Sequence, residues 1–251
     1  MIALLLEYDG TDYAGWQNQP NARTVQAEVE RAVGAAFGTK ADCIASGRTD
    51  TGVHARGQVV HVQFAGAHNN IPLHKIPLAV QTQLPRDIRV RAASFVEDNF
   101  HARYSAVSRE YVYRISREQS VFTQRFAWTP RVPFRDEVLA EALSVFRGVH
   151  NFTAVSKHNP DTASYECVVE HCGLADVGQE LHVAIRANRF VYGMCRGIIG
   201  AAMSVARGAH TIDELRMLLA NASRAGQPPL APPHGLALHC VRYANGIFEG
   251  L

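Results

Sequence analysis

The sequence is poor in the features that mark membrane-spanning, secreted and disulfide-bonded proteins. None of its apolar runs reaches the roughly 18 residues that a transmembrane helix requires. The apolar stretch from Met1 to Leu6 is shorter than the apolar region of a signal peptide, and Glu7 and Asp9 follow it directly. The five cysteines are odd in number and scattered, which favours free thiols in a reducing compartment. We therefore expect a cytoplasmic protein that does not enter the membrane.

Motifs for cofactors and metals are lacking as well. No glycine-rich loop ends in the Lys and Ser or Thr of a phosphate-binding motif, and no dinucleotide-binding fingerprint occurs. Cys167, His171 and Cys172 lie close together in the sequence, but their spacing matches no recognised zinc site. We therefore expect no metal and no small-molecule cofactor.

Lysine is scarce, so arginine carries nearly all of the positive charge. Lysine occurs only at Lys40, Lys75 and Lys157, and the formal net charge is +2. Arginine pairs with phosphates through its planar fork and stacks on bases, which would suit a nucleic-acid partner. A general preference of the genome for arginine codons explains the same composition, so the composition alone leaves the partner open.

What the sequence does contain is a polar, glycine-rich stretch between two apolar runs, from Ala45 to Gln58. The apolar run that follows alternates, with Val60, Val62 and Phe64 on one face, as expected for a half-buried strand. The polar stretch is therefore predicted to be a loop between two strands. Functional residues often lie in loops of this kind.

The charged side chains of this loop suit catalysis. Asp50 lies between Arg48 and Arg56, so its carboxylate should stay ionised at neutral pH and serve as a nucleophile or an electrostatic stabiliser. Two other interpretations start from the same residues. An Asp-Gly-rich loop is often only a turn, and Asp50-Thr51-Gly52 matches the triplet of aspartic proteases. Such proteases need two of these loops in an all-β frame, whereas this chain has one copy and several helical patterns.

A longer string in the same loop resembles a known family. Residues 47–55, Gly-Arg-Thr-Asp-Thr-Gly-Val-His-Ala, are similar to the active-site signature of the TruA-type tRNA pseudouridine synthases. Further blocks resemble that family in the same order along nearly the whole chain. They are Tyr8–Gln17, Thr24–Gln26, Leu84–Ile88, Phe100–Arg103, Arg109–Tyr113, Met194–Arg196 and Ala231–Leu236.

The first part of the chain predicts the element order β-α-β-β-α-β. The expected elements are a strand over residues 2–8, a helix from Thr24 to Gly38, two strands around the polar loop, a short helix from Pro77 and a strand over residues 88–92. This order is that of ferredoxin-like and RNA-recognition (RRM-like) domains. The segment from Gly66 to Lys75 looks longer than is usual in the family, and its role stays open.

The second part repeats this order with one helix inserted. Strands are expected over residues 111–115, 167–171, 181–185 and 236–243, and helices over 136–146, closed by Gly148, over 191–206 and after a capping box at Thr211 and Glu214. We therefore expect an α+β protein with two halves, residues 1–104 and residues 105–251. The resemblance implies that the halves join into one broad antiparallel sheet, with the active site in the cleft between them.

The resemblance also assigns roles to four residues. It implies that Asp50 is the catalytic carboxylate, that Tyr111 stacks on the target uracil, that Arg196 pairs with Asp50, and that Arg48 helps to displace the target nucleotide. Without the resemblance, Tyr111 is equally well a core residue, Arg196 could extend to water, and Arg48 could contact only phosphate or solvent. If Tyr111 faces the substrate, Tyr113 is the core residue of this strand.

These roles imply a cofactor-free isomerase that converts uridine to pseudouridine in the anticodon stem-loop of tRNAs and acts as a homodimer. Asp50 could attack C1′, add to C6 of uracil or remove a proton from C2′, and the sequence leaves these three routes open. The alternative is a non-catalytic RNA-binding protein with two RRM-like halves. Against it, the chain lacks the aromatic-rich strand that such domains use to stack bases.

The chain departs from the family pattern in two of its motifs. His150-Asn151-Phe152 stands where the family usually has His-Asp-Phe, which removes one charge. Cys195-Arg196-Gly197 stands where Val-Arg-Asn is common. Neither departure replaces Asp50 or Tyr111, and Arg196 itself is kept.

Overall fold

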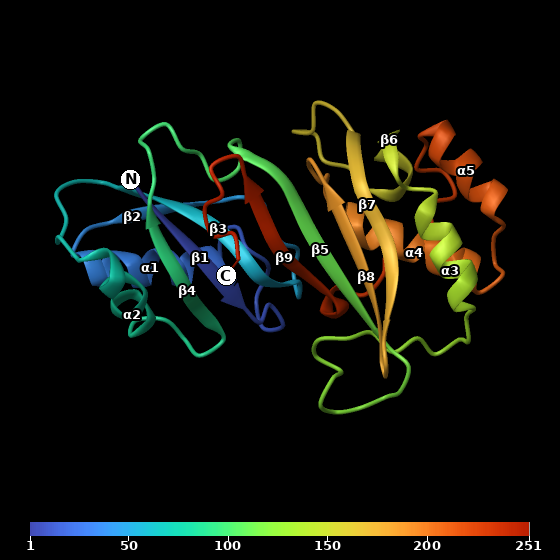
Figure 1. The fold of residues 1–251 in the computed structure, drawn as a ribbon, viewed down its shortest axis with the longest axis horizontal. Helices are drawn as coiled ribbons and strands as arrows, with labels where there is room; N and C mark the ends of the chain where they lie inside the picture. Colours follow the sequence, from blue (N-terminus) through green and yellow to red (C-terminus); the bar gives the residue numbers. More distant parts are fainter. Residues whose placement is uncertain (251) are drawn as a thin grey trace. The chain divides into compact units, whose positions relative to one another are not determined.

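The computed structural model describes residues 1–250, and in this range it contains nine β-strands and five α-helices (Figure 1). This composition confirms the predicted α+β class. The chain divides into two compact units, Met1–Val107 with Ala237–Leu251, and Ser108–Leu236. The segment from Ala237 onwards belongs to the first unit, whereas the sequence pattern placed it in the second half.

The first unit has the predicted order of elements. They are β1 (Ile2–Tyr8), α1 (Val25–Phe37), β2 (Ala41–Ala45), β3 (His54–Phe64), α2 (Ile76–Gln81) and β4 (Ile88–Phe95), with a short 3-10 helix, η1 (Leu73–Lys75), before α2. Within this unit the strand order is β4-β1-β3-β9, and β2 pairs with β3. β1 is antiparallel to both of its neighbours. Strand β9 (Leu236–Tyr243) pairs in parallel with the start of β3, which ties the C-terminal segment to this unit.

Helix α1 illustrates how local sequence sets the element bounds. The Thr24 side chain accepts a hydrogen bond from the Ala27 amide and caps the first turn. Gly38 adopts a left-handed conformation, with φ of 73°, and ends the helix. The predicted cap and stop are both confirmed. Removing such an N-cap typically costs about 1 kcal/mol of stability.

The polar stretch is a loop only as far as Val53, because β3 already begins at His54. The prediction of a loop up to Gln58 is therefore wrong. The backbone of these polar residues pairs with β1 on one side, where Leu6 faces Gln58, and His54 pairs with Ala237 of β9. Gly57 permits this approach, because a Cβ at this position would overlap the carbonyl oxygen of His239 on β9.

The second unit contains an antiparallel set of strands in the order β5-β8-β7-β6. Its elements are β5 (Ala106–Ser116), α3 (Asp136–Ser144), β6 (Gly148–Asn151), η2 (Phe152–Val155), β7 (Glu166–Val177), β8 (Glu180–Ala187), α4 (Met194–Ala206), α5 (Ile212–Asn221) and η3 (Pro233–Gly235). The first two residues of β5, Ala106 and Val107, belong to the first unit, and the rest of the strand belongs to the second. The Thr211–Glu214 capping box is confirmed. Helix α3 ends at Ser144, and Gly148 begins strand β6 instead of closing the helix as predicted. With only four residues, β6 is too short to show a strand pattern in the sequence.

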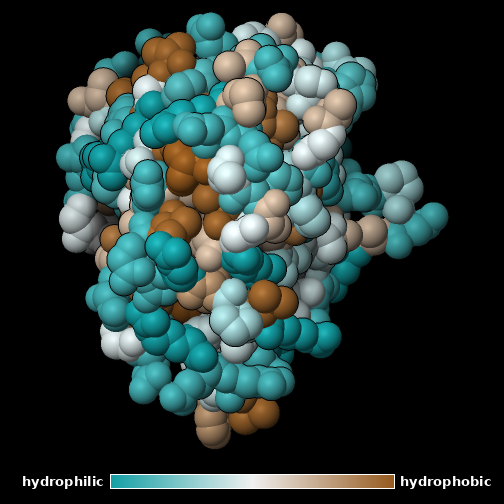
Figure 2. Space-filling view, turned by 90° about the vertical axis from the view of Figure 1, so that its right-hand side faces the viewer, coloured by the Kyte–Doolittle hydropathy of each residue, from teal (hydrophilic) through white to brown (hydrophobic). Residues whose placement is uncertain are grey.

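The face of the molecule drawn in Figure 2 is largely polar. On this face hydrophilic residues predominate and hydrophobic residues form small groups. Scattered apolar residues of this kind are normal on globular proteins. The helices within residues 1–250 include none with the length and hydrophobicity of a membrane-spanning segment. None of the five cysteines, which all lie within residues 1–250, forms a disulfide bond; four are buried and Cys240 is partly exposed.

Candidate active site

Asp50 lies in the loop between β2 and β3, and hydrogen bonds to the backbone of the β1–α1 loop hold the residues around it. The Trp16 amide donates to the Thr49 carbonyl at 3.0 Å, and the Gly52 amide donates to the Tyr13 carbonyl at 3.4 Å. The Val53 amide donates to the carbonyl of Asp50 itself at 3.0 Å and closes a turn. The backbone of Asp50 is therefore fixed from both sides.

A buried network of polar side chains supports this loop from the strands. The Tyr8 hydroxyl lies 2.8 Å from the Thr49 hydroxyl, and the Gln58 amide nitrogen donates to the Gly47 carbonyl at 2.8 Å. The Ser46 hydroxyl donates to the Gln58 amide oxygen at 2.7 Å, and the Gln58 nitrogen lies 3.5 Å from the Tyr8 hydroxyl. Burial raises the pKa of Tyr8 to about 12, so its phenol is neutral. Neutral side chains thus hold the residues before and after Arg48, namely Gly47 and Thr49.

His54, at the first position of β3, connects the Asp50 loop to the turn after β1. Its Nδ1 accepts a hydrogen bond from the Gly10 amide at 3.0 Å and lies 3.1 Å from a carboxylate oxygen of Asp9. That Asp9 oxygen accepts hydrogen bonds from the amide and the hydroxyl of Thr11. The imidazole is 5% exposed. A structural role for this histidine was not anticipated, because its partners lie more than 40 positions away in the sequence.

The two predicted residues of the first unit differ in exposure. Asp50 is half-buried and Arg48 is exposed. Buried Thr49 lies between them and points its hydroxyl into the Tyr8 network.

In the second unit, β5 carries Tyr111 and Tyr113. Tyr111 is 7% exposed, and its backbone lies opposite Ile185 of the neighbouring strand β8. Its ring contacts the Phe190 ring edge-on, with the ring centroids 4.9 Å apart. Tyr113 is fully buried, donates to the Pro232 carbonyl at 2.9 Å, and its pKa is raised by burial. Tyr113 is therefore a core residue, and Tyr111, two positions earlier on the same face of the strand, is buried as well.

Arg196 lies in the first turn of α4 and is half-buried. Its Nε donates to the Ala231 carbonyl at 2.7 Å, and the Ala231 amide donates back to the Arg196 carbonyl at 3.0 Å. The next residue, Gly197, packs against η2, where a Cβ would overlap the Val155 carbonyl group. The glycine that departs from the family pattern therefore fits a close backbone approach.

The Ala231–Gly235 segment contacts both Arg196 and β5, a role that the sequence did not reveal. Ala231 is bonded to Arg196, and Pro232 accepts the hydrogen bond of Tyr113. Gly235 lies so close to Tyr113 that a Cβ would be 2.8 Å from Cζ of the ring. The two prolines and the glycine in this block are the only sequence features that indicate a backbone with a restricted conformation and a close neighbour.

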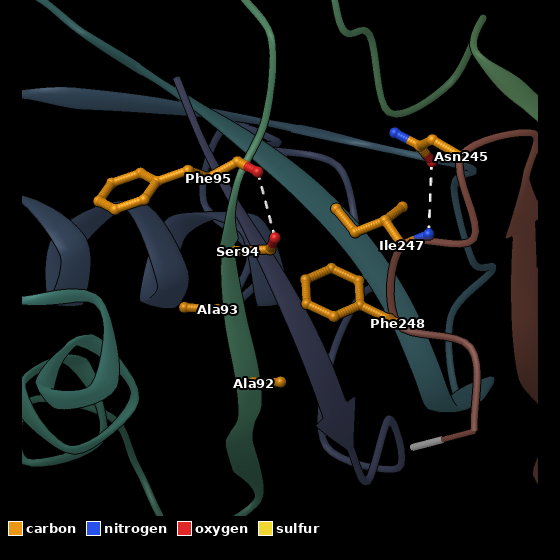
Figure 3. A pocket seen from close by; sticks show the side chains of 7 residues that line it. All are labelled: Ala92, Ala93, Ser94, Phe95, Asn245, Ile247 and Phe248. Carbon is orange, nitrogen blue, oxygen red and sulfur yellow. Dashed lines mark hydrogen bonds between the residues drawn. The ribbon is translucent and has the colours of Figure 1, made fainter.

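The structure also contains a cavity apart from these residues. It has a volume of about 400 Å³ and lies in the first unit between β4 and the C-terminal segment (Figure 3). Ala92, Ala93, Ser94 and Phe95 line one side, and Asn245, Ile247 and Phe248 line the other. Among residues 1–250, no three His, Cys, Asp or Glu side chains are grouped as a metal site.

Comparison with known proteins decides the family. A model of the tRNA pseudouridine synthase family matches residues 4–105 and 142–244. The chain belongs to this family. Its members are isomerases, so the chain is an enzyme of that class and the aspartic-protease interpretation is set aside. Asp50, Arg48 and Arg196 lie within the matched residues, and Tyr111 lies between the two matched stretches.

Relatives from several bacteria extend the match over the whole length. The tRNA pseudouridine synthase A of Chlamydia pneumoniae is 36% identical over 97% of this chain and 92% of its own. The protein of the same name from Halalkalibacterium halodurans is 38% identical, over 99% and 94% of the two chains. The one from Akkermansia muciniphila is 39% identical, over 98% and 96%.

Proposed function

We propose that this chain isomerises uridine to pseudouridine in the anticodon stem-loop of tRNAs, with Asp50 as the essential carboxylate. The observation that carries the proposal is the family match across the Asp50 loop. The geometry of the loop supports it, because backbone hydrogen bonds fix Asp50 and a buried neutral network supports its neighbours. Preorganisation of this kind is what a catalytic carboxylate needs.

The reaction requires no electron donor and no energy source. The bond between N1 and C1′ of uridine breaks, the base turns, and a bond forms between C5 and C1′. The proton on C5 is lost and N1 gains one, so substrate and product are isomers. Asp50 either attacks C1′, adds to C6, or removes the C2′ proton. In each case the carboxylate must be ionised and aimed at a nucleotide drawn out of its helix.

We assign three further residues to substrate binding. Arg196 would pair with Asp50, and the Ala231 carbonyl at its Nε restricts how its guanidinium can turn. Tyr111 would stack on the target uracil, with Phe190 limiting the tilt of its ring. Arg48, exposed beside Asp50, would enter the place of the displaced nucleotide.

We also propose that the enzyme acts in the cytoplasm as a homodimer. None of the five cysteines forms a disulfide bond, which suits a reducing compartment. Sedimentation at micromolar concentration tests the assembly, since one chain has a mass of 27.6 kDa. A species of twice this mass supports the dimer, and a single species of one chain contradicts it.

The decisive experiment uses an unmodified tRNA transcript and maps pseudouridine by carbodiimide primer extension. We expect stops in the anticodon arm with the wild-type protein and none with Asp50→Asn, although that variant should still bind tRNA. Asp42→Asn, which changes an exposed carboxylate on β2, is the matched control and should keep full activity. Full activity of Asp50→Asn would refute the proposal. Wild-type binding without stops on any tRNA would favour the non-catalytic binder.

A further inference from the structure

The loop between β4 and β5 carries an exposed aromatic ring that the proposed chemistry does not use. Tyr104 is 75% exposed, whereas Phe100 and Ala102 of the same loop are buried. A single exposed apolar residue is normal on a protein surface, so the exposure of Tyr104 alone does not mark a binding site. The contacts of this loop decide whether the ring is mobile or held in place.

Aromatic rings form a continuous column from the core of the first unit to Tyr104. The buried His61 ring, on β3, has its centroid 6.3 Å from Phe100 and 4.8 Å from His101. The His101 ring in turn lies 4.3 Å from the Tyr104 ring, tilted by 37°. Tyr104 is thus the outermost ring of the column, with most of its surface exposed.

Hydrogen bonds fix the backbone of the loop beneath the ring. The Ala102 amide donates to Nδ1 of His61 at 3.1 Å, and the Ala102 carbonyl accepts from the Tyr243 hydroxyl at 2.7 Å. The amides of Arg103 and Tyr104 both donate to Nδ1 of His101, at 3.1 and 3.3 Å. Side chains from β3 and β9 therefore hold a loop that would otherwise be free to move.

We propose that Tyr104, together with Arg103, is a stacking platform for an unpaired base of the tRNA. Every base has a face that stacks on an aromatic ring, and stacking on a ring that is already fixed costs little ordering entropy. The Arg103 guanidinium lies 5.6 Å from the centre of the Tyr104 ring and brings a positive charge to the same place. Charge and aromatic surface together fit a nucleic acid better than an apolar protein partner.

The platform serves a different part of the tRNA from the target uridine. His61, which anchors the platform, is seven residues beyond His54 along β3, and His54 borders the Asp50 loop. Seven strand residues span roughly 23 Å. The platform therefore contributes to the affinity for tRNA and leaves the chemical step at bound tRNA unchanged. This inference rests on the proposed function, because it takes tRNA as the substrate.

The test compares full-length protein variants on one unmodified tRNA transcript, by equilibrium binding and by single-turnover pseudouridine formation at saturating enzyme. Tyr104→Ala is expected to weaken binding by about fivefold to 100-fold and to leave the saturated rate within twofold. Tyr104→Phe should bind like the wild type. Phe95→Ala removes another exposed ring of the same unit and is the matched control, expected to change binding by less than twofold.

A direct readout of stacking comes from Tyr104→Trp, which should keep its affinity and gain fluorescence that bound tRNA quenches. Unchanged affinity of Tyr104→Ala, or an equal loss in Phe95→Ala, would overturn the platform while leaving the proposed function intact. A wild-type protein that neither binds nor modifies tRNA would instead refute the proposed function. If Tyr104→Ala sediments as a smaller species than the wild type and the loss of affinity follows this dissociation, the ring contacts a second copy of the chain and the platform is refuted.

Discussion

The Asp50 loop and the start of helix α4 are held in place by different kinds of contact. Around Asp50, buried side chains such as Tyr8 and Gln58 add to the backbone hydrogen bonds that hold the loop. At the start of α4, the support comes from backbone carbonyls, one bonded to Arg196 and one packed against Gly197. Side chains around a deleted atom can shift to fill part of the space. Where two backbone segments touch, an added Cβ atom has no space, so the segments must move apart. Substitutions in the two regions should therefore differ in severity.

The largest effect is expected from Gly197→Ala. The new Cβ would overlap the Val155 carbonyl group, so α4 or η2 must move. We expect a loss of about 3 kcal/mol in the free energy of unfolding, more than the helix gains from alanine. Urea unfolding measures this loss. Gly66→Ala is the control, because its Cβ meets nothing within 4 Å. Equal unfolding midpoints for the two variants would refute the close-approach argument.

A second substitution tests the side-chain network at its centre. Gln58→Leu is nearly equal in size but removes the hydrogen bonds that Gln58 makes with the Ser46 hydroxyl and the Gly47 carbonyl. Loss of a hydrogen-bond partner in a buried network costs about 1–3 kcal/mol. We expect a loss of about 2 kcal/mol in stability and at least a tenfold drop in the rate of pseudouridine formation. Gln63→Leu, an exposed change on the same strand, should leave the rate unchanged. A normal rate in Gln58→Leu would mean that the network does not position Asp50.

These two regions also show what sequence can and cannot predict. Helices α1 and α5 were predicted through local caps, at Thr24 and Thr211, whose partners lie three residues away. The start of β3 at His54 was missed, because it depends on pairing with β1 and β9, which are distant in sequence. Asp50 stands out in a motif. The link between Tyr8 and Gln58 spans 50 positions, so no local pattern reveals it.

A contact made by a titratable side chain also depends on pH, because protonation changes the charge of the side chain. A contact between backbone segments does not depend on pH in this way. Burial, and then the neighbouring His101, lower the pKa of His61 from 6.5 to about 4 in the folded protein. Between these values the unfolded chain binds the proton more tightly, so the stability contributed by neutral His61 is complete above pH 6.5 and is lost as the pH falls to about 4. We expect about 2 kcal/mol of pH-dependent stability from this residue. Urea unfolding at pH 7 and pH 4.5 should show a smaller difference in His61→Gln, and an equal difference would contradict this assignment.

The smallest effect is expected from Tyr8→Phe, which removes one hydroxyl from the network and keeps the ring beside Trp16. The phenol is neutral, so no charge is lost, and the cost is mainly that of the short hydrogen bond to Thr49, about 1 kcal/mol, since the bond from Gln58 is long, at 3.5 Å. Because Thr49 precedes Asp50, the rate of pseudouridine formation should fall severalfold.

A double-mutant cycle with Thr49→Val isolates this bond. If the bond holds Thr49, the double variant should lose about 1 kcal/mol less than the sum of the single variants, since the second substitution removes a group that has already lost its partner. Strictly additive losses would mean that the backbone bond from Trp16 to Thr49, rather than the hydroxyl pair, holds this residue. The Asp50 loop would then resemble the start of α4, and the contrast between the two regions would disappear.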